Sequence, residues 1–173
     1  MRRLLAAAAT AALVTVAGCS SQRQVTAAAP SVSSVAPPTT VKVQALSRAA
    51  AAKRYLEIVR PYNLALERLE QAFNAGEPVV TLRALAGSVA RSNAAHMRQL
   101  RATAWPSLVG APMKQLLAES AAAQRYWLEA AEAGTREELA RSVIAATRHD
   151  GTDAANKVRH ALGLDDYDET AVS

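Results

Sequence analysis

The stretch that decides the fold is YLEIVRPYNLALERLEQAF, residues 55–73. Its large apolar and aromatic side chains recur at alternating steps of four and three residues, which is the spacing of one face of an α-helix. The pattern predicts a helix from about Ser47 to Asn74 that packs along its length. Pro61 cannot donate a hydrogen bond to the carbonyl of Glu57, so we expect a kink there. The residues of this apolar seam are Tyr55, Val59, Tyr62, Leu66, Leu69 and Phe73.

Three more helices are predicted from similar patterns and from the turn signals between them. Residues 74–78, with their glycine and proline, end the first helix, and Trp105-Pro106 ends the second. Thr135, with Glu138 three residues later, forms a capping-box pattern that starts the fourth. We therefore expect helices over about 47–74, 79–103, 108–133 and 135–162.

The composition supports an all-helical domain. Only 4% of the chain is aromatic and β-branched clusters are sparse, which disfavours sheet. Four long helices with short connections predict an all-α, up-down-up-down four-helix bundle over residues 46–164. Asp150-Gly151 lies inside the fourth segment, so we expect a break or bend there, with Thr152 as a candidate second cap. Pairing of two chains stays open, because the sequence does not specify the oligomeric state.

The N-terminus carries an export pattern. Residues 1–3 are a short basic region, residues 4–14 form an apolar run, and Val16-Ala17-Gly18-Cys19 follows. This order is typical of a secretory signal peptide. The last four of these residues resemble the lipobox of bacterial lipoproteins. The resemblance implies a signal peptide over residues 1–18, cleavage before Cys19, and lipid attached to Cys19, which is the only cysteine.

The implied product is an exported protein in the cell envelope, anchored by its lipid to the outer face of the cytoplasmic membrane. Residues 19–45 are rich in Ala, Ser, Pro, Val and Thr without a helical or strand period, which predicts a flexible linker. Residues 165–173 predict an acidic, disordered tail. The formal charge of +5 falls to +3 when Arg2 and Arg3 leave with the signal peptide. That excess is too small to indicate a nucleic-acid partner.

Asn93 and His96 are the candidate ligand-binding residues. They lie one turn apart on the inward stripe of the second predicted helix, where Leu or Val would pack better. One interpretation makes them the polar floor of a small pocket, or part of a metal site with Asp150 or Asp153. The other makes them an interhelical hydrogen-bonding pair that fixes the packing register.

Motifs for metal binding or catalysis are not found in the sequence. Di-iron bundles use Glu-x-x-His pairs, but none of the three histidines has a carboxylate three residues before it. The chain has no Gly-x-Ser-x-Gly motif, and its single cysteine is assigned to the lipid. We therefore expect no cofactor, no resident metal and no enzyme activity.

These patterns predict a membrane-anchored envelope lipoprotein with a helical binding or interaction domain. Apart from membrane lipid at Cys19, its partner would be an envelope protein docked on an exposed apolar patch. The first helix offers Leu56, Ile58 and Leu64 for such a patch. The alternative is a small-molecule or metal-binding sensor with a pocket near Asn93 and His96.

Overall fold

The computed structural model describes residues 44–165, and all regular structure in that range is helical. The signal peptide, the lipobox with Cys19, the linker as far as residue 43 and the tail from residue 166 lie outside the described residues. The prediction of an all-α helical bundle is confirmed. The elements are α1 (Arg48–Asn74), α2 (Val79–Ala102), the 3₁₀ turn η1 (Ser107–Val109), α3 (Gly110–Glu132), α4 (Arg136–Thr147) and α5 (Thr152–Leu162).

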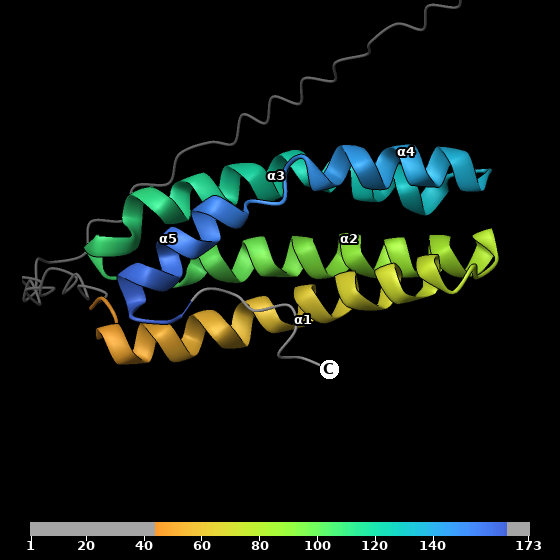
Figure 1. The fold of residues 1–173 in the computed structure, drawn as a ribbon. Coiled ribbons are helices and arrows are strands. Elements are labelled where there is room, and N and C mark those ends of the chain that lie inside the picture. The colour runs from red at the N-terminus through yellow and green to blue at the C-terminus, as the bar shows by residue number, and fades with distance from the viewer. Residues whose placement is uncertain (1–43, 166–173) are drawn as a thin grey trace, which may run out of the picture. The chain divides into compact units, whose positions relative to one another are not determined.

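The helix starts agree with the capping chemistry of the sequence. Ser47 precedes α1, and its hydroxyl accepts a hydrogen bond from the backbone N–H of Ala50 at 3.3 Å. Thr135 and Glu138 form the full capping box of α4. α1 continues as one helix through Pro61. Figure 1 shows that α1, α2, α3 and α4 alternate in direction, as the bundle prediction requires.

The predicted fourth helix is two helices, so the bundle contains five rather than four. The break falls at the expected position, where Gly151 adopts φ +70°, a left-handed conformation that favours glycine. The carboxylate of Asp150, and not the side chain of Thr152, supplies the cap: Asp150 Oδ1 accepts the N–H of Thr152 at 2.9 Å. The prediction of Thr152 as the cap is therefore wrong. Just before the break, His149 Nδ1 lies 3.1 Å from Glu119 Oε2 on α3.

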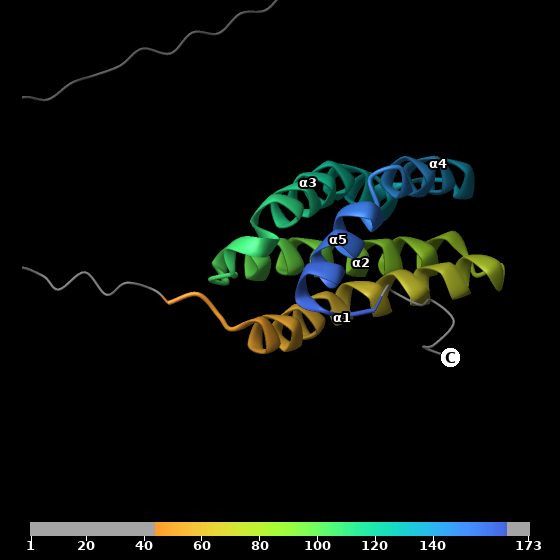
Figure 2. The same cartoon turned by 60° about the vertical axis from the view of Figure 1, so that its left-hand side comes forward.

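The break lets the two halves pack against different neighbours. α4 lies along α3, whereas α5 contacts both α3 and α1 (Figure 2). The buried core divides accordingly into two clusters, each of which gains its stability from apolar surface removed from water. The α4 cluster includes Leu69, Leu82, Val89, Trp127 and Leu139, and the α5 cluster includes Tyr55, Ile58, Leu100, Met113 and Val158.

α1 and α4 do not pack against each other along their lengths. No Cα atom of α1 lies within 8 Å of a Cα atom of α4. Arg136, the first residue of α4, joins the two helices at one end by donating hydrogen bonds to the carbonyls of Phe73 and Glu77, each at 2.8 Å. Its guanidinium also lies 4.7 Å from the centre of the Phe73 ring. Arg136 thus closes the bundle at the C-terminal end of α1. Along the rest of their lengths α1 and α4 stay apart.

Candidate functional site

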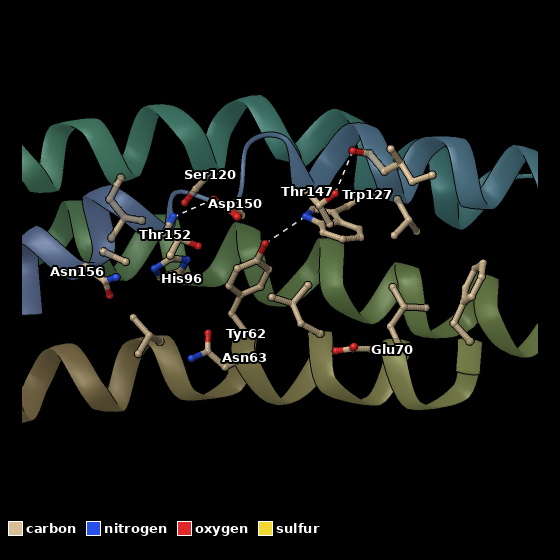
Figure 3. Close-up of a pocket in the computed structure, with 18 of the residues that line it drawn as sticks. Tyr62, Asn63, Glu70, His96, Ser120, Trp127, Thr147, Asp150, Thr152 and Asn156 are labelled. Atoms are coloured by element: carbon tan, nitrogen blue, oxygen red, sulfur yellow. Dashed lines mark hydrogen bonds between the residues drawn. The ribbon is translucent and has the colours of Figure 1, made fainter. Parts of the chain in front are cut away.

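The space between these helices is a cavity of about 960 Å³, which we call the α1–α4 cleft. α1 forms one wall, α4 and α5 form the opposite wall, and residues of α2 and α3 form the floor (Figure 3). Its volume lies at the upper end of the range for small-molecule sites, about 300–1,000 Å³.

The apolar seam predicted on the first helix faces this cleft. All its residues line the cavity: Tyr55, Val59, Tyr62, Leu66, Leu69 and Phe73. The spacing predicted a packing face, and half of the seam does pack, because Tyr55, Val59 and Leu69 are buried in the two core clusters. Tyr62, Leu66 and Phe73 are only partly buried. A seam that would meet a fourth helix in a closed bundle therefore remains available to a ligand.

The half of the cleft beside α4 is mainly apolar, although Thr147 and the carboxylate of Glu70 also lie in it (Figure 3). Ala140, Val143 and Ile144 line it from α4, opposite Leu66 and Phe73 of α1. Ile144 is 56% exposed. A ligand in this half would cover apolar surface that the fold leaves in contact with water.

The half beside α5 is polar. Figure 3 shows His96, Asn156, Thr152 and Ser120 grouped at this end of the cavity. Asp150 lies between this group and the apolar half, and its carboxylate already accepts the N–H of Thr152. The cleft therefore changes from apolar to hydrogen-bonding character along its length.

His96 is the central polar group of the cleft. It is 4% exposed, and neither ring nitrogen has a hydrogen-bond partner among the described residues. Its ring stacks on Tyr62 with centroids 5.5 Å apart and 17° between the planes. Burial lowers the pKa of His96 to about 4, so the imidazole is neutral at neutral pH. A neutral imidazole offers one hydrogen-bond donor and one acceptor.

Tyr62 and Trp127 hold the aromatic wall beside His96. Trp127 Nε1 donates a hydrogen bond to Tyr62 Oη at 3.2 Å. Burial raises the pKa of Tyr62 to about 12; the indole hydrogen bond opposes the rise and the charge of Asp150 adds to it. The phenol therefore stays protonated, and its position is fixed from α3.

Asn93 and His96, which the sequence places on one stripe, have different surroundings. Asn93 is fully buried and does not line the cleft. Its Nδ2 donates to the backbone carbonyl of Ser120 at 2.8 Å and to Gln124 Oε1 at 2.9 Å, which ties α2 to α3. The structure thus gives Asn93 the interhelical contact and gives His96 the position in a pocket.

The metal interpretation finds no ligand set in the described range. Asp150 lines the cleft with His96, whereas Asp153 does not. Residues 44–165 contain no group of three or more His, Cys, Asp or Glu side chains placed to hold a metal ion. The sequence also gave no reason to single out Asn156, whose Oδ1 is buried without a hydrogen-bond partner in the same range.

No protein-family model, curated protein or solved structure matches the chain. None of the helices in the described range is long and apolar enough to cross a membrane. Function is therefore inferred from the cleft and from the N-terminal sequence pattern.

Proposed function

We propose that this chain is a lipid-anchored envelope protein whose helical domain binds a small, largely apolar molecule in the α1–α4 cleft. The observation that carries the proposal is the cleft itself, with its aromatic and aliphatic walls and the buried, unpartnered imidazole of His96 on its floor. Mostly apolar walls with a few convergent polar groups are the usual composition of a small-molecule site.

The anchor follows from the lipobox pattern at Cys19. A single acyl chain gives marginal membrane binding, whereas two or three chains hold a protein stably. The test is metabolic labelling with radioactive palmitate. The wild-type protein should carry the label and Cys19→Ser should not; label that persists on the variant would refute the anchor.

Binding without catalysis fits the groups in the cleft. Nucleophilic and acid–base mechanisms need a nucleophile or an acid paired with a positioned base. His96 makes no hydrogen bond to another described side chain that could be activated in this way. Its depressed pKa also makes it a weak base, which suits a hydrogen-bonding role better than proton transfer.

Docking of a protein on the α1 surface is less well supported. The apolar docking patch that the sequence suggested requires Leu56, Ile58 and Leu64 to be exposed on the same surface. Ile58 is 1% exposed and belongs to the α5 core cluster, while Leu56 is 40% exposed. Because Ile58 is buried, these residues do not form the apolar patch that the sequence suggested, and the cleft is the better candidate site.

The ligand can be sought directly in protein purified from membranes. Extraction with organic solvent followed by mass spectrometry should release one molecule, or one related set, in near-stoichiometric amount. Ala140→Phe adds a ring inside the apolar half of the cleft and should reduce that amount strongly, because Ala140 lines the cavity. The matched control is Arg141→Phe, which adds the same ring at an exposed neighbouring position outside the cavity lining. Equal retention by both variants would refute the cleft as the binding site.

A further inference from the structure

Resting on the proposed function, we infer that the ligand is a single-chain amphiphile with an uncharged, hydroxyl-bearing head group. Its head lies beside His96 and Asn156, and its hydrocarbon chain lies along the apolar half between α1 and α4. A monoacylglycerol is the simplest molecule of this class.

The shape of the cleft favours a chain. Its lining on α1 extends from Tyr55 to Asn74, which is about 29 Å at 1.5 Å per residue. Side chains of α4 line the opposite wall over one part of this length and side chains of α5 over the other. A long, largely apolar space of this kind suits an extended hydrocarbon better than a compact ligand.

The unpartnered polar atoms define the head group. His96 Nδ1, His96 Nε2 and Asn156 Oδ1 are buried without hydrogen-bond partners among residues 44–165. The neutral imidazole provides one donor and one acceptor, and the amide oxygen provides a further acceptor. A hydroxyl group both donates and accepts, so a head group with two hydroxyls can donate to both acceptors while accepting from the imidazole N–H. A carboxylate can only accept, and a quaternary ammonium can do neither.

The charges around the cleft also favour an uncharged head. The carboxylate and guanidinium side chains in its lining are those of Glu70, Asp150 and Arg159. Asp150 caps α5 through Thr152, and the guanidinium Nε of Arg159 donates to the backbone carbonyl of Asp165. Two carboxylates against one guanidinium do not form an anion site. His96 does not supply the missing positive charge either, because its burial keeps the imidazole neutral.

The test compares three ligands that share one hydrocarbon chain. The mature chain with Ser in place of Cys19 is titrated at pH 7.5 with 1-monooleoylglycerol, oleate and oleyltrimethylammonium, and binding is followed by tryptophan fluorescence, since Trp127 lines the cleft. Monooleoylglycerol should bind about ten-fold more tightly than either charged ligand, as expected when buried polar groups are paired rather than left unpaired. Equal or tighter binding of oleate would overturn the head-group inference.

Variants at the polar end separate head recognition from chain binding. His96→Phe and Asn156→Leu should each weaken binding of monooleoylglycerol by about ten-fold while changing oleyltrimethylammonium binding little. His96→Gln keeps a donor and an acceptor and should restore part of the affinity. Circular dichroism establishes that each variant is folded. If no variant discriminates between the head groups, the placement of the head beside His96 is wrong.

The same experiment distinguishes failure of this inference from failure of the proposed function. If none of the three ligands binds, yet Ala140→Phe still removes a molecule extracted from the wild-type protein, the ligand class is wrong and the cleft remains the site. If nothing is extracted and nothing binds, both are wrong. Monooleoylglycerol is also offered within phosphatidylglycerol vesicles. Uptake from vesicles identifies the membrane as a source, and uptake only from solution identifies free amphiphiles.

Discussion

Replacing His96 with Phe should stabilise the folded protein while weakening ligand binding. The phenyl ring has nearly the same shape and can keep the stack on Tyr62, but it has no polar atoms to bury. In the wild-type protein both ring nitrogens are buried without partners in the described range. A buried unsatisfied polar group costs about 1–3 kcal/mol. We therefore expect His96→Phe to raise the free energy of unfolding by about 1–3 kcal/mol at pH 7.5 without ligand.

The stability difference should widen as the pH falls. Above the ordinary pKa of 6.5 the imidazole is neutral in both folded and unfolded states, so it adds no pH dependence. Between pH 6.5 and about 4 the unfolded chain takes up the proton and the folded protein does not. This uptake favours unfolding by up to about 3 kcal/mol at the acid end. His96→Phe removes this penalty, and every other titratable group is the same in both proteins.

The assay is urea unfolding followed by circular dichroism across this pH range, with ligand removed beforehand. If His96→Phe is no more stable than the wild-type protein at pH 7.5, and the difference stays constant down to pH 4, the buried imidazole is already satisfied. The reasoning about the polar end of the cleft would then fail.

Three other changes test the elements that shape the cleft, each read as a shift in urea midpoint. Arg136→Met removes two charge-assisted hydrogen bonds, one to the carbonyl of Phe73 in the last turn of α1 and one to that of Glu77 in the loop after it, and should cost about 1–3 kcal/mol; an unchanged midpoint would show that the end of the bundle closes without it. Thr135→Ala removes the capping box of α4 and should cost about 0.5–2 kcal/mol, with Thr135→Ser as the control that retains it. Gly151→Ala forces a Cβ into a left-handed residue at 3.0 Å from Leu116 Cδ1 and should cost about 1–2 kcal/mol; a neutral effect would contradict the sharp break before α5.

The helices could be predicted from the sequence because their signals are local. Ser47 and the Thr135–Glu138 pair cap helices through residues three positions away, and Asp150-Gly151 marks the break. Local patterns did not reveal that α4 and α5, the two parts of the predicted fourth helix, pack against different neighbours. Their positions depend on long-range contacts such as those of Arg136 with the end of α1.

The candidate site was predictable only in part for the same reason. Asn93 and His96 both stood out as polar residues on an apolar helix face. The pattern could not show which of them forms hydrogen bonds to a neighbouring helix. Gln124 and the carbonyl of Ser120, both on α3, accept from Nδ2 of Asn93, while Asn93 Oδ1 has no hydrogen-bond partner among the described residues. The apolar seam of α1 could not be recognised as a ligand wall, because an amphipathic face looks the same whether a helix or a cavity lies opposite it.

The central claim, that a small molecule occupies the α1–α4 cleft, is tested most directly by the two tryptophan indole N–H signals in an NMR spectrum. The mature chain with Ser in place of Cys19 is recorded as purified and again after bound molecules are stripped on a hydrophobic resin. Trp127 lines the cleft, whereas Trp105 lies outside its lining and donates to the carbonyl of Leu100 at 2.7 Å. We expect the Trp127 signal to move on stripping and to return when the extract is added back, while the Trp105 signal stays in place. A Trp127 signal that does not move, although the extract contains a bound molecule, would contradict the account.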